Sequence, residues 1–473
     1  MPSTTQSVAS SLPNYSVSAP PPDYSAQVTE GEELLAATHT SFSSRRADSY
    51  SRSWDRGPGI RVVLRELNED IVDDIPVYHQ RGLICGTIYQ DNVRNTLQIE
   101  GKLKFSVFGN NSHTRTVKVV DECYELWSRS PPQVGPSADS HGIEFSSVLP
   151  TTFRDGDRSV PIPPSHEISL MGVPGVYSQC TYALKILVVT RGPLWNKTQS
   201  FTIPFKYRSR SRPLVPLVTN EGIQPGCPIF HATIKSAPEV WFETLSILQT
   251  KTASGLKPVE VQIFIPSGRT FGLADTIPFH TQLTGTSPSI QKLYTLLSPL
   301  SASAEYRALQ LSQTLSAQST ADSISSIDRG KYSVVGRSDR DYICFSVTLT
   351  RQVCVELKDQ VVWKSFNIGK GVLHPIPPPF ELAMADNPFF SDSAEDDSKR
   401  IVNLDSAGEI QCWPDIHVGH FNVGDNVQVK DFLVVQIAPS EKSDNARSPF
   451  LPLKMAIPIF LVTDSWSEQP MFP

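Results

Sequence analysis

The clearest alternation of apolar and polar side chains lies between Val77 and Phe108. Apolar or small residues occupy every second position of two runs, which are separated by a polar loop at Gln90–Thr96. These positions are Tyr78, Gly82, Ile84, Gly86 and Ile88, followed by Leu97, Ile99, Gly101, Leu103, Phe105 and Val107. Side chains on a strand point to opposite faces in turn, so the pattern predicts a half-buried antiparallel hairpin.

A second unit of the same kind follows in the other half of the chain. Val259, Val261, Ile263 and Ile265 alternate with polar neighbours, and alternation resumes over Ile277–Leu283 after a Pro-Ser-Gly break. Further runs of strand length are separated by Pro and Gly, without helical periodicity between them. We therefore expect an all-β protein with two β-sandwich domains in tandem.

Breaks in this pattern and shifts in composition predict the domain organisation. Residues 1–58 are rich in Ser and Pro and show no apolar periodicity, so a disordered tail is expected there. The expected units after it are an N-terminal sandwich at 59–207, a linker at 208–237, a C-terminal sandwich at 238–465 and a short tail at 466–473. The second sandwich carries expected insertions at 285–330 and 369–406.

Composition narrows the class of protein. A chain of 473 residues with 39 prolines fits two or three domains of short strands and turns, and a net charge of -6 argues against general nucleic-acid binding. No apolar run reaches membrane-spanning length and no signal peptide is evident at the N-terminus, so a cytoplasmic protein without a transmembrane segment is expected. Seven scattered cysteines without a CxxC pair indicate reduced thiols.

Several segments resemble the arrestin superfamily, specifically the fungal α-arrestins, also called arrestin-related trafficking adaptors. In the first sandwich the resemblance lies in the spacing of Tyr78, Gly82 and Gly86 before the strand Leu97–Val107. In the second it lies in Val259–Pro266, Gly272–Pro278, Val429–Val435 and Ile457–Val462. The resemblance covers roughly Gly59 to Thr463 outside the insertions, and it implies two arrestin-like sandwiches.

Two short motifs in the tail strengthen this resemblance, because α-arrestins carry PPxY or LPxY motifs that recruit HECT-type ubiquitin ligases through WW domains. The motifs here are Pro21-Pro22-Asp23-Tyr24 and Leu12-Pro13-Asn14-Tyr15. Consecutive prolines are preset in the polyproline II conformation, so Pro21 and Pro22 lose little entropy on docking to an aromatic groove. A Pro-rich tail also produces such a motif by chance, and the arrestin-like body is what favours function.

A third candidate motif, Asn387-Pro388-Phe389, lies in the second insertion and has the form read by EH domains of endocytic proteins. An Asn-Pro turn would present the Phe side chain, although three letters also arise easily by chance. Arg61, Arg65, Arg208, Arg210 and Arg212 would suit phosphorylated cargo, but we interpret them as ordinary surface arginines.

No catalytic constellation, metal-ligand cluster or cofactor-binding motif is evident, so a non-enzymatic protein without a cofactor is expected. The leading hypothesis is an adaptor that brings a HECT-type ubiquitin ligase to a plasma-membrane transporter or receptor. It would be recruited peripherally to the plasma membrane or endosomes and promote cargo ubiquitination and endocytosis. The alternative is an arrestin-fold trafficking scaffold that acts without a ligase.

Overall fold

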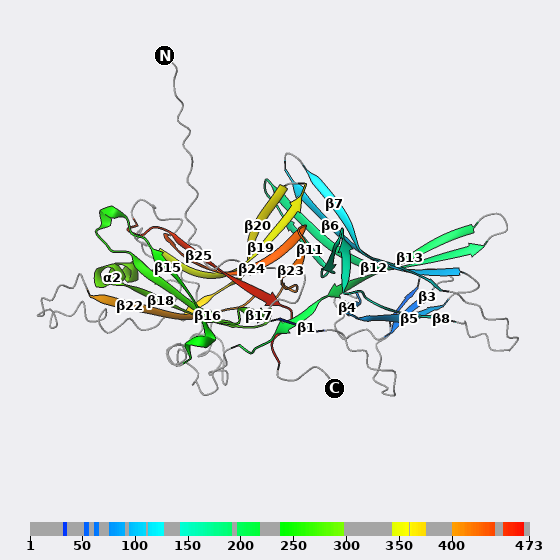
Figure 1. The fold of residues 1–473 in the computed structure, drawn as a ribbon, viewed down its shortest axis with the longest axis horizontal. Helices are drawn as coiled ribbons and strands as arrows, with labels where there is room; N and C mark the ends of the chain where they lie inside the picture. Colours follow the sequence, from blue (N-terminus) through cyan, green and yellow to red (C-terminus); the bar gives the residue numbers. More distant parts are fainter. Residues whose placement is uncertain are drawn as a thin grey trace, which may run out of the picture.

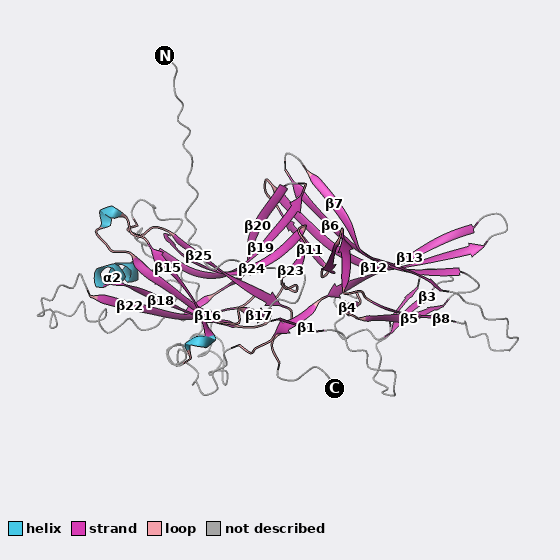
Figure 2. Ribbon diagram, in the orientation of Figure 1, coloured by secondary structure: helices cyan, strands magenta, loops and turns pink. Residues whose placement is uncertain are grey.

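The computed structural model is built almost entirely of β-strands (Figure 2). It describes residues 32–35, 52–55, 61–65, 75–89, 94–109, 112–126, 142–191, 196–217, 237–297, 343–358, 360–374, 400–439 and 448–467. Within these ranges the helices are α2 (Ser287–Leu296) and the short 3-10 turns η1 (Pro238–Val240) and η2 (Thr252–Ser254). None of them is long and apolar enough to cross a lipid bilayer. The predicted all-β fold is confirmed.

The N-terminal sandwich pairs a small sheet with a large one. The small sheet has the order β2 (Arg52–Asp55), β3 (Arg61–Arg65), β5 (Leu83–Tyr89) and β8 (Gly142–Val148). The large sheet has the order β4 (Val77–His79), β13 (Asn196–Arg208), β12 (Gly175–Arg191), β6 (Arg94–Phe108) and β7 (His113–Leu126). β11 (His166–Leu170) also pairs with β12, and β9 (Thr152–Asp155) forms a hairpin with β10 (Arg158–Pro161).

The C-terminal sandwich is built in the same way. Its first sheet has the order β15 (Trp241–Leu248), β16 (Val259–Pro266), β18 (Ile277–Thr286), β22 (Ile401–Ile410) and β21 (Val372–His374). Its second has the order β17 (Thr270–Gly272), β25 (Leu453–Val462), β24 (Val427–Pro439), β19 (Ile343–Leu357) and β20 (Gln360–Lys370), with β23 (Phe421–Val423) on β24. Figure 1 shows the two sandwiches beside each other along the long axis.

The two sandwiches share their strand order, including its least common feature. Each large sheet is antiparallel except for one short edge strand, which pairs in parallel as β4 with β13 and as β17 with β25. Each long hairpin also carries one irregularity in register, in β6–β7 and in β19–β20. At these irregularities Val119 and Ile368 have no opposite residue in the register, and both are buried. The chain therefore contains one topology twice.

The apolar positions identified from the sequence form the cores of these sandwiches. Val259, Val261, Ile263 and Ile265 on β16 have no solvent exposure, while the residues between them are partly exposed. The apolar positions on β6 are buried in the same way. Complete burial of such a side chain stabilises the fold by about 1.5–3 kcal/mol, so the alternation fixes which face of each strand turns inward.

The predicted pairing of the first unit is wrong, although its strands exist. β5 pairs with β3 and β8 in the small sheet, whereas β6 pairs with β7 and β12 in the large sheet. The chain therefore passes from one sheet to the other between β5 and β6 and forms no hairpin there. Alternation reports which face of a strand is buried and not which strand lies beside it. In the second unit β16 and β18 do pair antiparallel.

The predicted limits of the tail and of the linker also need correction. Strands β1 (Glu32–Leu35) and β2 lie within the predicted tail at 1–58, and β14 (Arg210–Pro213) lies within the predicted linker at 208–237. β1 pairs antiparallel with β14, and β2 pairs antiparallel with β3. Four-residue strands are too short to show a period, and they are ordered because a partner edge from a distant part of the chain is available.

Both predicted insertions include residues that belong to the C-terminal sandwich. Within 285–330, helix α2 packs Ile290 and Leu293, neither of which is exposed, into the C-terminal core. Within 369–406 lie β21 and the start of β22, which pairs along its whole length with β18. The apolar residues of β22 alternate only at Val402 and Leu404, so its sequence carried a weak strand signal beside an acidic stretch.

Candidate functional site at the junction of the two sandwiches

The N-terminal strand β1 ties the two sandwiches together. Glu33 Oε2 lies 2.7 Å from Arg212 Nε on β14, the strand that leaves the N-terminal sandwich. Glu32 Oε2 lies 3.3 Å from Nε2 of His420, which belongs to the C-terminal sandwich. Glu32 and Arg212 are both buried. Adjacent carboxylates of β1 therefore contact basic side chains on opposite sides of the junction.

The end of the C-terminal sandwich meets the same strand β14. The Ser211 amide donates to Thr463 Oγ1 at 2.9 Å, and the Asp464 amide donates to the Ser211 carbonyl oxygen at 2.9 Å. The Arg210 guanidinium lies against the Asp464 carboxylate, with Nη2 and Oδ1 2.5 Å apart. The N-terminal strand, the connection between the sandwiches and the C-terminal segment thus meet at one place, which we call the junction (Glu32–Leu35, Arg210–Pro213, His420 and Thr463–Asp464).

The sandwiches also contact each other directly through apolar side chains. The core of the N-terminal sandwich continues into residues of β19, β20, β23 and β24, among them Val353, Val355, Phe421 and Val423. Polar pairs border this contact: Asn426 receives a hydrogen bond from Arg115 at 3.0 Å, and Arg158 lies 2.7 Å from Asp425. A shared apolar core indicates that the two sandwiches hold a defined relative position.

Two histidines at this contact have opposite electrostatic surroundings. Burial lowers the pKa of His166 to about 4, with its ring nitrogens bonded to the Pro164 carbonyl and the Ser178 hydroxyl and its face on Phe421. Burial also acts to lower the pKa of His420, but the hydrogen bond and charge of Glu32 outweigh it and raise that pKa. His166 is therefore a neutral packing group, whereas Glu32 favours the protonated form of His420.

A buried ion pair lies beside these residues in the large sheet of the C-terminal sandwich. Arg351 on β19 directs Nε and Nη2 at the two oxygens of Asp431 on β24, at 2.7 and 3.0 Å, and donates Nη1 to the Val418 carbonyl oxygen. Burial acts to lower the pKa of Arg351, but the charge and hydrogen bonds of Asp431 outweigh it and raise that pKa. Asp431 is completely buried, so each partner depends on the other.

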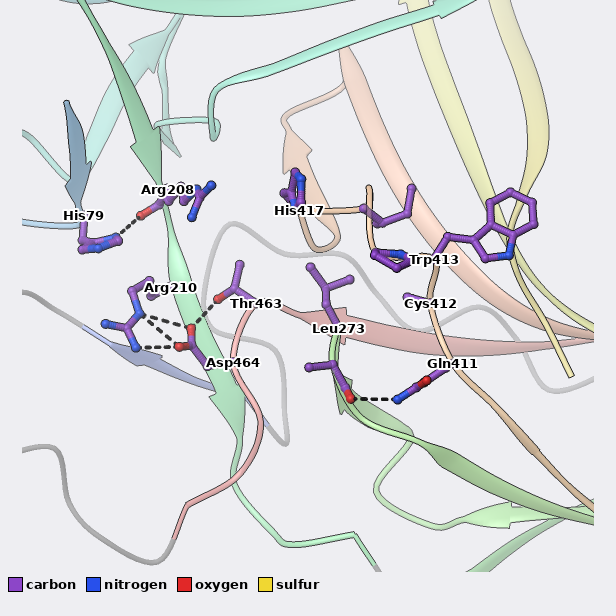
Figure 3. A pocket seen from close by; sticks show the side chains of 13 residues that line it. His79, Arg208, Arg210, Leu273, Gln411, Cys412, Trp413, His417, Thr463 and Asp464 are labelled. Carbon is purple, nitrogen blue, oxygen red and sulfur yellow. Dashed lines mark hydrogen bonds and ion pairs between the residues drawn. The ribbon is translucent and has the colours of Figure 1, made fainter. Parts of the chain in front are cut away.

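Two cavities open between the sandwiches, with volumes of about 500 and 720 Å³. They share Arg208, Ile416 and His417. Figure 3 shows the smaller one, with Arg208 and His417 on facing walls and the Arg210–Asp464 pair at one side. Polar and apolar residues both line the larger one, and Leu170, Phe205 and Phe421 are among the apolar ones. Cavities of this size at domain contacts commonly bind small molecules or peptide segments.

Cys412 lines the smaller cavity. Burial raises the pKa of the Cys412 thiol to about 12, which leaves it protonated and unreactive at neutral pH. In the part of the chain that the structure describes, no group of three or more His, Cys, Asp or Glu side chains is placed to hold a metal ion.

The expectation for the arginines is wrong in part. Arg210 and Arg212 are not ordinary surface arginines, because β14 places them between the N-terminal strand and the C-terminal segment, each paired with a carboxylate. Arg65 is an exposed arginine paired with Glu144, and Arg61 is exposed. Reading the sequence alone missed Glu32 and Asp431, whose partners are 80 or more positions away and therefore leave no local pattern.

The predicted motif residues lie outside the described residues. They are Leu12, Pro13 and Tyr15 of the LPxY motif, Pro21, Pro22 and Tyr24 of the PPxY motif, and Asn387, Pro388 and Phe389 of the NPF motif. No protein-family model matches the chain, and no curated protein is found as a relative. A functional interpretation therefore depends on these motifs and on the geometry of the junction.

Proposed function

We propose that the protein is an arrestin-like adaptor that recruits a HECT-type ubiquitin ligase to membrane-protein cargo. The PPxY motif binds a WW domain of the ligase, and the LPxY motif adds a second, weaker site. The paired sandwiches bind the cytoplasmic part of a transporter or receptor. Ubiquitin is then transferred by proximity, and the protein itself performs no chemistry.

The observation that carries this proposal is the place at which the N-terminal segment is held. Tyr24 precedes Glu32 by eight residues, and Glu32 is fixed at the junction by His420 and by pairing with β14. Eight residues span at most about 29 Å. A WW domain bound at Tyr24 therefore stays close to both sandwiches, and this raises the effective concentration of the ligase at bound cargo.

Two motifs on one segment favour ligases with several WW domains. Tyr15 and Tyr24 are nine positions apart, so binding of one motif holds the other within short reach. An NPF motif between β21 and β22 would add EH-domain endocytic proteins as partners. Peripheral recruitment to the plasma membrane or endosomes follows from cargo binding in this proposal.

The second candidate function is a trafficking scaffold that acts without a ligase. It is favoured by the binding cavities and the shared core, which need no motif in the N-terminal segment. The two candidates make different predictions for Tyr24, because only the adaptor needs its side chain.

The experiment that separates them follows the turnover of surface transporters in cells whose own copy is replaced by variants. We expect the double substitution Tyr15→Ala, Tyr24→Ala to stop ubiquitination and internalisation of the cargo. A matched control, Tyr294→Ala, removes a half-exposed tyrosine of α2 and should leave turnover unchanged. Normal cargo turnover in the double variant would support the scaffold.

A further inference from the structure

The turn between β11 and β12 presents two large apolar side chains to solvent. Met171 is 86% exposed and Val173 is 82% exposed, more than any other large apolar residue in the described part of the chain. Single exposed apolar residues are common on protein surfaces and need no explanation. Two of them on one turn, both almost fully exposed, indicate a contact with something outside the chain.

The backbone of this turn is held firmly in place. Leu170 and Val176, which flank the turn, face each other in the β11–β12 ladder. Gly172 has a φ of 126°, which residues other than glycine rarely adopt. A Cβ atom at this position would lie 2.9 Å from the Lys364 ammonium. The exposed side chains therefore project from a turn whose two ends are paired in the sheet.

The apolar surface continues onto the neighbouring hairpin. Phe108, at the end of β6, is 44% exposed and faces Gly175 in the β6–β12 ladder. A Cβ atom on Gly109 would lie 3.8 Å from Pro174, so the two chain segments touch. We call Phe108, Met171, Val173 and Pro174 the apolar tip. In Figure 1 the β6–β7 hairpin reaches the upper edge of the molecule.

The charges beside the apolar tip are mainly positive. Lys364 of β20 lies against Gly172, and Lys104 lies over the ring of Tyr177 at 5.8 Å. Glu167 is the nearby carboxylate, and it accepts a hydrogen bond from the Tyr177 hydroxyl at 3.4 Å. Lysines around protruding apolar side chains complement the anionic headgroups of a bilayer, while the apolar groups enter its interfacial region.

We propose that the apolar tip inserts Met171 and Val173 into an anionic lipid bilayer. Its two main side chains are almost fully exposed on a turn, which suits entry into a bilayer better than packing in a groove. The proposal depends on the proposed function only for the membrane where the adaptor works, since insertion needs neither ligase nor cargo.

The test is sedimentation of the full chain with vesicles of phosphatidylcholine alone or mixed with phosphatidylserine. We expect binding to the mixed vesicles, and the variant Met171→Asp, Val173→Asp should weaken partitioning by at least about tenfold. The matched control is the double variant Leu245→Asp, Ile247→Asp. These two apolar residues of β15 have the same spacing in the chain and are 54% and 51% exposed. This control should bind as the natural chain does.

Two further measurements separate insertion from surface attraction. A Val173→Trp variant should gain fluorescence that shifts to shorter wavelength on the mixed vesicles and is quenched by brominated lipids. Lys364→Gln should weaken binding to the mixed vesicles by about fivefold, because it removes one favourable charge. The proposal is overturned if the natural chain does not bind the vesicles, or if the test and control variants lose binding equally. It is also overturned if the variant Met171→Asp, Val173→Asp loses cargo binding while its vesicle binding is unchanged. WW-domain binding is unaffected in every case, so the adaptor proposal is tested separately.

Discussion

The two sandwiches share one strand order but differ in the side chains on the central strands of their large sheets. In the N-terminal sandwich Gly101 on β6 faces Tyr182 on β12, whose hydroxyl donates to the Pro163 carbonyl at 2.5 Å. In the C-terminal sandwich the corresponding strands β19 and β24 place Arg351 opposite Asp431. One topology therefore accommodates either a ring packed on a glycine or a buried ion pair.

The difference follows from what each sheet must contact. One face of β19 serves two cores, since Val347 and Leu349 pack within the C-terminal sandwich and Val353 and Val355 pack against the N-terminal one. Arg351 lies between these two pairs and also lines the larger cavity. The ion pair thus sits where the C-terminal core passes into the contact between sandwiches. Tyr182 belongs to the N-terminal core and lines the same cavity.

The largest effect is expected from breaking the ion pair. Asp431→Ala leaves the buried Arg351 guanidinium without its partner and should lower the free energy of unfolding by about 3–5 kcal/mol. Chemical denaturation measures this loss. The double variant Arg351→Met, Asp431→Leu should recover most of the stability, and a double variant as unstable as the single one would contradict the assigned role of the pair.

The next effect concerns His166 in the N-terminal sandwich. Its pKa is lowered to about 4 in the folded protein, so below its ordinary value of 6.5 the unfolded chain binds the proton more readily. Stability should therefore fall as the pH drops from 6.5 towards 4, by on the order of 1–3 kcal/mol. Thermal unfolding of His166→Phe should show a weaker fall over this range, and an unchanged pH profile would refute the prediction.

A smaller effect is expected when a side chain is added at Gly101, beside the ring of Tyr182. A Cβ atom on Gly101 would lie 2.6 Å from Tyr182 Cε1 and 2.9 Å from Val119 Cγ2, so Gly101→Ala should cost about 1–3 kcal/mol through overpacking. Gly109→Ala is the matched control, because its Cβ would stand at an ordinary contact distance. Denaturation midpoints that are equal for the two variants would show that the centre of this sheet is not tightly packed.

The smallest effect concerns the N-terminal strand and has the opposite pH dependence to that of His166. The pKa of His420 is raised in the folded protein by Glu32, so its contribution is present below the unfolded pKa of 6.5 and is lost as the pH rises through the folded pKa. Glu32→Gln should lower stability by about 1 kcal/mol near pH 6 and by less near pH 9. A difference that grows with pH would contradict the Glu32–His420 pair.

The sequence predicted the all-β class and most buried positions, because alternation over strands such as β6 and β16 reports burial directly. It failed on pairing, since β5 and β6 alternate equally well as a hairpin or as members of two sheets. It also failed on β1 and on Arg351–Asp431, because their partners lie far away in the chain. Such contacts are decided by tertiary structure and leave no local signal.

In the proposed function, Tyr24 recruits a ligase to the two sandwiches, which hold the N-terminal segment at the junction. We would first measure, by calorimetry, the affinity of the full chain for a WW domain from a HECT-type ligase. We expect a dissociation constant of about micromolar order, with a loss of affinity of at least about tenfold on Tyr24→Ala and a smaller loss on Tyr15→Ala. Affinity that is absent, or that is unchanged by Tyr24→Ala, would contradict the account and leave the scaffold as the better explanation.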